Sequence, residues 1–244
     1  VKHHLYGFHD VKDNFSTGDW LKLVVKNIKE IKKRKKIPIL VGGTGLYFKA
    51  LTEGLVNIPN IPIRFRNKTR VLQNTLGQKK FYQNLLKLDP ISKNKINPTD
   101  TQRSIRAYEV KQFTKKSLHE WFKDTKSYFE NKNFFKIYLD YPRQELIKKI
   151  NLRTEQMIKN GAIMEVKKFT NLKVRNDKSV NKAIGIKEIQ EYLKNEKDLS
   201  DIKEKISIKT RQYAKRQNTW ARGNMMGWYK LQPQVINKFL KKIK

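Results

Sequence analysis

The sequence predicts an α/β protein that carries an inserted helical subdomain. Apolar side chains recur at helical spacing through residues 16–36, and the apolar run IPILV follows at residues 37–41. A run of that length and composition is typical of a buried parallel strand, and a new helix is expected from Leu46. Helix, strand and helix in this order indicate an α/β sheet. Residues 65–127 contain only helical patterns, which indicates an insertion.

The remaining elements follow from local signals. Ser16 or Thr17 is expected to cap the first helix, with Asp19 in its first turn. The segment FFKIYLDYP has strand character that ends at Pro142, and GWYKL near the C-terminus is expected to form a last strand. The predicted division is a core made of residues 1–64 and 128–244 around an insertion of residues 65–127.

Composition points towards polyanionic partners. Lys and Arg number 55 against 22 Asp and Glu, which gives a formal net charge of +33. An excess of this size favours RNA or DNA, although solvated lysine faces explain the bulk charge about equally well. The chain contains no cysteine, which excludes disulfides and cysteine–zinc sites. No apolar run approaches the roughly 18 residues of a membrane span.

The turn VGGTGLY, residues 41–47, comes directly after the predicted strand. Glycine-rich turns at helix starts often hold phosphate. No lysine follows these glycines, so the turn is not a GxxxxGK[ST] phosphate loop. We expect the glycines to let the backbone come close to another group at the end of the strand.

The segment KTRQYAKRQNTWAR, residues 209–222, is predicted to be a helix with two faces. One face is expected to point to the core and comprises Ile202, Ile206, Thr210, Tyr213, Gln217 and Trp220. The other face carries Arg211, Lys215, Asn218 and Arg222, a pattern that suits a phosphate backbone. A solvated basic face explains the pattern about equally well. The several arginines favour binding slightly, because the planar guanidinium group fits phosphate with two hydrogen bonds.

Two further segments are ambiguous. In TDTQRSIRAYEV, Thr99 and Gln102 fit a capping box, and Arg106 serves either a ligand or an ion pair with Glu109. In NKAIGIKE, an ordinary turn between helices is a better explanation of Gly185 than a ligand. Neighbouring histidines near the start point to opposite sides of an extended chain, which argues against a metal site.

Seven pieces, in this order, resemble the tRNA dimethylallyltransferase (tRNA isopentenyltransferase) family. They are HHL, FSTGDW, IPILVGGTGLYFKALTEGL, DTQRSIRAYEV, LDYPRQELIKKINLRTEQMIKNGAIMEV, AIGIKEIQEYL and TRQYAKRQNTWAR. No single piece is decisive, but together they span the chain almost from end to end.

The resemblance implies a fold and a reaction. The fold is a P-loop-containing nucleotide hydrolase-like parallel-sheet core with a helical insertion. The reaction transfers a dimethylallyl group from dimethylallyl diphosphate to the N6 amine of the adenosine 3′-adjacent to the anticodon, with Mg²⁺ as cofactor. The adenine is flipped out of its stack, which exposes the amine. The implied partners are the tRNA anticodon stem-loop and dimethylallyl diphosphate, and the implied state is a cytoplasmic monomer.

The resemblance also implies site residues. Thr44 lines the channel where base and prenyl group meet, and Arg153 lies near the diphosphate. The residues implied to contact tRNA are Arg66; Gln102, Arg103, Ser104, Ile105 and Arg106; Lys182, Ala183, Ile184, Gly185, Ile186 and Lys187; and Lys215, Arg216, Gln217, Asn218, Thr219, Trp220, Ala221 and Arg222.

The sequence departs from the family pattern at its start. The family's P-loop, the first strands and the aspartate that acts as general base have no counterpart here. We therefore expect a fragment that lacks this N-terminal segment, binds tRNA and is inactive in isolation. Within the motifs, Ile186 replaces a usual tyrosine and Ala221 a bulkier residue. The alternatives are a P-loop kinase for a small metabolite and a non-catalytic RNA-binding module.

Overall fold

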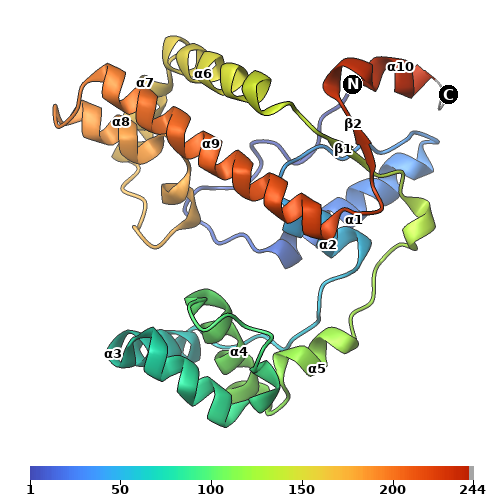
Figure 1. Cartoon of the computed structure of the whole chain (residues 1–244), viewed down its shortest axis with the longest axis vertical. Helices are drawn as coiled ribbons and strands as arrows, with labels where there is room; N and C mark the ends of the chain where they lie inside the picture. The colour runs from blue at the N-terminus through green and yellow to red at the C-terminus, as the bar shows by residue number, and fades with distance from the viewer. Residues whose placement is uncertain (242–244) are drawn as a thin grey trace. The chain divides into compact units, whose positions relative to one another are not determined.

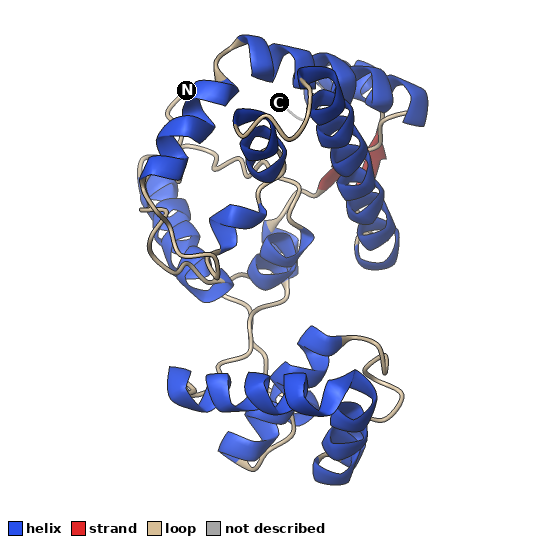
Figure 2. Cartoon of the chain, turned by 90° about the vertical axis from the view of Figure 1, so that its left-hand side faces the viewer, coloured by secondary structure: helices blue, strands red, loops and turns tan. Residues whose placement is uncertain are grey.

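The computed structural model describes residues 1–241, and helices dominate it (Figure 2). Its longer elements in chain order are α1 (Thr17–Lys33), α2 (Gly45–Thr52), α3 (Ile63–Leu88), α4 (Thr101–Thr114), α5 (Leu118–Lys123), β1 (Ile137–Leu139), α6 (Arg143–Lys159), α7 (Ala162–Asn171), α8 (Ile186–Leu193), α9 (Leu199–Asn224), β2 (Tyr229–Leu231) and α10 (Ile236–Lys241). Short 3₁₀ turns lie at Pro90–Ser92, Asn131–Asn133, Ser179–Lys182 and Pro233–Val235.

The chain divides into two compact units. One unit comprises Val1–Phe48 and Lys132–Lys244, and the other comprises Lys49–Asn131. The second unit includes more residues at each end than the predicted insertion of residues 65–127. Within the described residues, none of the helices combines the length and apolar character needed to cross a membrane.

The helices α6 to α9 form the main core of the first unit. Figure 1 shows α9 running beside α6 and α8, and α9 contacts both of these helices. The apolar cluster shared by α6 to α9 contains Ala162, Val166, Ile189, Ile202 and Ile206. A buried hydrogen bond of 3.1 Å from the Ser207 hydroxyl to the Thr154 hydroxyl also joins α9 to α6. The N-terminal half of α9 is therefore fixed by burial on one side.

The two strands pair in parallel, with Ile137 opposite Tyr229 and Leu139 opposite Leu231. Both strands are where the sequence predicts them, and a parallel sheet among many helices confirms the α/β class in its coarse form. The described residues contain only this small sheet, so the larger P-loop-type core remains a prediction.

The predicted buried strand at residues 37–41 is wrong. Residues 36–42 carry no strand hydrogen bonding, and Ile39 and Val41 are 81% and 83% exposed. A β-strand needs a neighbour for its backbone N–H and C=O groups, and neither β1 nor β2 pairs with this segment. The composition of this segment suits a strand, but composition alone does not provide a pairing partner.

The unit Lys49–Asn131 is built on α3 and α4, as its helical patterns predict. Its core contains Ile61, Tyr82, Leu85, Ile96, Ala107, Val110 and Leu118. The helix α3 breaks at Gly77, whose φ of 71° is left-handed. Asp89 follows α3 and is fully buried, and its Oδ2 accepts from the hydroxyls of Ser92 and Ser117 at 3.0 and 2.8 Å. Asp89 thus connects the end of α3 to the start of α5.

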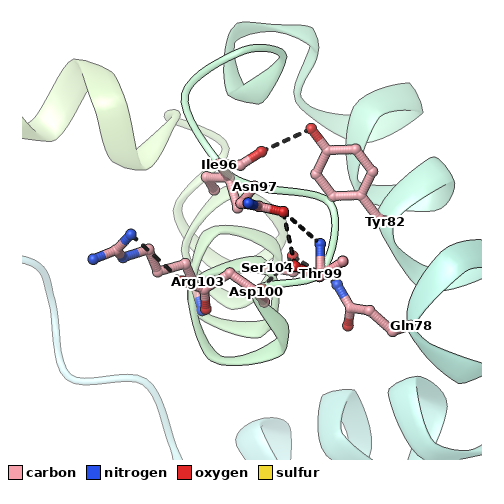
Figure 3. Close-up of polar contacts among 8 residues, drawn as sticks. All are labelled: Gln78, Tyr82, Ile96, Asn97, Thr99, Asp100, Arg103 and Ser104. Atoms are coloured by element: carbon pink, nitrogen blue, oxygen red, sulfur yellow. Dashed lines mark hydrogen bonds and ion pairs between the residues drawn. The ribbon is translucent and has the colours of Figure 1, made fainter. Parts of the chain in front are cut away.

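The caps of the helices agree only in part with the sequence analysis. Ser16 caps α1 and forms a capping box with Asp19, as predicted. The predicted Thr99 cap is wrong, because Asp100 accepts from the Arg103 N–H at 3.0 Å and caps α4 (Figure 3). The Thr99 hydroxyl instead donates to Asn97 Oδ1 at 2.8 Å. Two good capping residues in succession make the choice depend on the preceding turn.

Ser117→Ala should destabilise the unit Lys49–Asn131 by about 2–3 kcal/mol, because it removes a helix cap and a hydrogen bond to a buried carboxylate. Ser16→Ala is the matched control, since it removes an exposed cap and should cost only about 1 kcal/mol. Urea denaturation followed by circular dichroism measures both. Equal losses would contradict the role given to Asp89.

Candidate functional site

The GGTG turn lies directly against the C-terminal half of α9. Gln217 Nε2 donates a hydrogen bond of 2.9 Å to the carbonyl oxygen of Gly43. A Cβ at Gly43 would lie 2.2 Å from Gln217 Nε2, and a Cβ at Gly45 would lie 2.2 Å from the Trp220 ring. The two glycines are therefore needed for the close approach of α9. Two segments 174 residues apart in sequence are brought together here.

Thr44 occupies the exposed tip of this turn. Its carbonyl oxygen accepts from the Tyr47 N–H at 3.0 Å, which begins the first turn of α2. Tyr47 stacks on Trp20 of α1, with ring centroids 4.3 Å apart and an interplanar angle of 16°. The backbone around Thr44 is thus held by α9 on one side and connected through α2 to α1. Its side chain remains open to a ligand.

The two predicted faces of α9 are partly realised. Ile202 and Ile206 are buried, whereas Tyr213 is 41% exposed. Lys215 and Arg222 are exposed on the basic face, and Arg211 and Asn218 are half-buried. Arg216 lies over the Tyr213 ring at 5.7 Å, which favours a cation–π contact. The predicted stretch also contains Thr219, whose hydroxyl donates to the Lys215 carbonyl at 3.0 Å, and the buried Ala221.

The stretch Lys182–Lys187 is organised by a buried glutamate that sequence analysis did not single out. Gly185 has a φ of 106° and donates its N–H to Glu188 Oε2 at 2.9 Å. Lys209 of α9 forms an ion pair with Glu188 Oε1. Burial raises the pKa of Glu188, but the hydrogen bonds from Lys209 and from backbone N–H groups outweigh it, and the net pKa is lowered. The turn at Gly185 therefore has a structural cause.

The rest of this stretch lies near the α8 N-terminus. Lys182, Ala183 and Lys187 are exposed, and Ile184 and Ile186 pack on the apolar cluster of α6 to α9. Ile186 is half-buried and has a packing role. Exposed lysines remain the groups here that can meet RNA.

In the unit Lys49–Asn131, Arg106 and Glu109 form the ion pair that was one of the two expected possibilities. Arg106 Nη1 lies 3.7 Å from Glu109 Oε2. Burial raises the pKa of Glu109 against the opposing effect of Arg106, Arg66 and Arg70, and burial lowers the pKa of Arg106. The Nε of Arg66 and the Oε1 of Glu109 are buried without a hydrogen-bond partner. Several arginines thus lie around the Glu109 carboxylate, which does not provide hydrogen bonds for all of them.

The start of α4 presents a second arginine outward. Gln78 and Tyr82 of α3 hold the preceding loop through Pro98 and Ile96, at 2.7 and 3.0 Å. Figure 3 shows the Arg103 side chain pointing away from these contacts, and Arg103 forms only a 3.4 Å ion pair with Asp100. Arg103 is therefore open to a polyanion.

The other residues of this stretch differ in exposure. Gln102 is exposed. Ser104 and Ile105 are buried, and the Ser104 hydroxyl donates to the Asp100 carbonyl at 2.8 Å. Ser104 and Ile105 serve the core of this unit and lie too deep for direct contact with a ligand. Arg153 is exposed on α6, one position before the buried Thr154.

Comparison with known proteins defines the class. The family model described as IPP transferase matches residues 1–224, and the chain belongs to this family. It is 57% identical to the tRNA dimethylallyltransferase of Pelagibacter ubique over 244 residues, which are 100% of this chain and 78% of that protein. It is 42% identical to the tRNA dimethylallyltransferase of Rickettsia typhi over 225 residues, 90% of this chain and 71% of that one.

Solved structures agree with this assignment. A tRNA isopentenylpyrophosphate transferase from Bacillus halodurans matches with a TM-score of 0.64 and 31% identity, over 100% of this chain and 76% of that one. A eukaryotic dimethylallyltransferase acting on tRNA matches with a TM-score of 0.78 and 25% identity, over 96% of this chain and 62% of that one.

Gly45→Ala should destabilise the fold by about 1–3 kcal/mol, because the new methyl group meets a packed Trp220 ring. Gly43→Ala should cost less, since the end of a flexible glutamine can move aside. Gly223→Ala is the control, because a methyl group there meets nothing within 4 Å. It lies in α9, where alanine favours helix by about 1 kcal/mol over glycine. Thermal denaturation ranks the three, and a neutral Gly45→Ala would contradict the close approach.

Glu188→Gln should destabilise the protein by about 1–3 kcal/mol at pH 7, since it removes a charged hydrogen bond to Lys209. The folded-state pKa of Glu188 lies below its ordinary value of 4.5. Its contribution is therefore fully present above pH 4.5 and is lost as pH falls through the folded-state pKa. Urea titrations at several pH values should show the difference between wild type and variant shrinking in acid. A difference independent of pH would contradict this assignment.

Proposed function

We propose that this protein is a tRNA dimethylallyltransferase, which transfers the dimethylallyl group of dimethylallyl diphosphate to the N6 amine of the adenosine 3′-adjacent to the anticodon. The observation that carries the proposal is the contact between the Thr44 turn and α9. It joins an exposed hydroxyl to a helix whose exposed face bears Lys215 and Arg222. Membership of the IPP transferase family favours this function over a small-metabolite kinase and over a simple RNA-binding module.

The chemistry is a substitution at carbon. The N6 nitrogen forms a bond to C1 of the dimethylallyl group, the C1–O bond breaks, and diphosphate leaves with the electron pair. The amine proton goes to a general base, which the resemblance assigns to an aspartate without a counterpart in residues 1–244. We assign Thr44 a hydrogen-bonding role that orients the flipped adenine, because orientation of the reacting groups lowers the barrier.

The exposed cations are proposed to hold the tRNA. In the first unit, Lys215 and Arg222 of α9 and Lys182 and Lys187 near α8 meet the phosphate backbone of the anticodon stem-loop. In the unit Lys49–Asn131, this role is given to Arg103, Arg66, Arg106 and Gln102. Arg153 is kept as a diphosphate contact. Phosphate contacts give affinity and register, and the flipped base gives specificity.

Magnesium is implied by the family. Within residues 1–241 no group of three or more carboxylate or imidazole side chains converges on a metal-sized site. The residues described here do not fit Mg²⁺ by themselves, and no step is assigned to it. We also propose that the protein is a monomer in the cytoplasm.

The double variant Lys215→Ala/Arg222→Ala tests the RNA face. It should weaken binding of an anticodon stem-loop and reduce the slope of log K against log salt by about 2, one for each lost phosphate contact. Filter binding between 50 and 200 mM salt, a range over which phosphate contacts dominate affinity, measures both quantities.

The control Lys29→Ala/Lys33→Ala removes the same charge from exposed positions of α1. It should leave the slope unchanged. An equal change of slope in both variants would show that only net charge matters. Incorporation of the labelled dimethylallyl group into tRNA, measured on the protein that includes the expected N-terminal segment, tests the reaction itself. Phosphorylation of a metabolite instead would overturn the proposal.

A further inference from the structure

We infer that Gln217 and Trp220 are positioning residues for the Thr44 turn rather than direct tRNA contacts. The inference rests on the proposed function, because it concerns the turn that carries Thr44. It reassigns two residues within a stretch that the family resemblance gives to tRNA as a whole.

The side chain of Gln217 is already engaged. Its Nε2 donates to the Gly43 carbonyl at 2.9 Å, so its amide group serves a backbone oxygen of the turn. The Gly43 backbone lies so near that a side chain on it would collide with the same amide. A nucleotide that took this amide would leave the Gly43 carbonyl without its donor. Gln217 is therefore matched to the turn.

Trp220 engages the turn one helical step further on. Its ring lies where a Cβ of Gly45 would be, with Cε3, Cζ3 and Cδ2 at 2.2, 2.3 and 2.5 Å from that position. The ring face or edge that meets Gly45 is covered and cannot stack on a base. Gln217 and Trp220 are three residues apart, so both lie on one face of α9. They contact the turn on either side of Thr44, one through a hydrogen bond and one through packing.

This arrangement links two properties of the site. Lys215 and Arg222 lie two residues from Gln217 and Trp220 respectively, but are exposed. An α-helix places residues two apart on different faces. The same rigid turns of α9 thus present cations to solvent and hold Thr44 from the inner side. RNA bound to the outer face is registered against Thr44 without a contact to Gln217 or Trp220.

Gln217→Met tests the inference, because methionine keeps the length of the side chain and removes the donor. Amide hydrogen exchange at Thr44–Tyr47 should become faster. In the protein that includes the expected N-terminal segment, the kcat of dimethylallyl transfer should fall about tenfold, the effect of one lost hydrogen bond on an oriented group, while the KM for tRNA stays within about twofold. Gln217→Glu should have a larger effect in the same direction, because it places a carboxylate against the Gly43 carbonyl.

Gln212→Met is the matched control, since Gln212 is exposed on the same helix. It should change neither exchange nor kcat. Unchanged exchange in Gln217→Met, or a raised KM with an unchanged kcat, would overturn the inference and make Gln217 an RNA contact. Thermal denaturation confirms that each variant is folded.

The two proposals fail separately. Exchange at the turn needs no substrate, so it tests the positioning role even in a protein that transfers nothing. If the protein that includes the expected N-terminal segment shows no transfer but Gln217→Met still loosens the turn, the proposed function fails and the positioning role stands.

Discussion

The close contact between the GGTG turn and α9 is the constraint on which the candidate site depends. It requires two residues without side chains, at Gly43 and Gly45, opposite two large side chains, Gln217 and Trp220. Interiors of proteins are packed densely enough that one methyl group is felt. The turn and the helix therefore determine each other, and the position of Thr44 follows from both.

The helix α9 meets different demands along its length. Its first half is buried against α6 and α8 through Ile202 and Ile206. Its second half contacts the GGTG turn on one side and carries exposed cations on the other. A helix that is anchored by a buried half can hold like charges in its other half at little cost, because solvent screens them. Burial at one end thus holds the exposed cationic face at the other in place.

In the unit Lys49–Asn131, some charged side chains are buried instead of exposed. There Arg106 is half-buried and Glu109 is 4% exposed, so desolvation opposes both charges. A buried carboxylate that lacks a partner on one oxygen, beside an arginine Nε that also lacks one, is only partly satisfied. The ion pair of Arg106 therefore does not exclude a second role. An anion that approached Arg66 and Arg106 would meet cations already brought together by Glu109.

Local signals in the sequence predicted local structure well. Ser16 with Asp19 gave the start of α1, and the apolar segments around Ile137 and Tyr229 became β1 and β2. The segment around Ile39 had equally good strand composition but found no neighbour, because pairing is a tertiary property. The choice of Asp100 over Thr99 as cap depended on a loop held by Tyr82, which no local pattern contains.

The site was predicted in its parts and missed in its connections. Thr44 in a glycine-rich turn and cations on the α9 helix were both predicted from the sequence, but the contact between the turn and the helix was not. A glycine is ambiguous in sequence, because it serves a ligand, a turn or a neighbouring side chain equally well. At Gly43 and Gly45, the neighbouring side chains of Gln217 and Trp220 explain the glycines. One sequence signal for this contact was available, namely Trp220 and Gln217 at helical spacing on the core-facing side of the helix. A large ring on that side needs a neighbouring surface with room for it, and glycines supply that room.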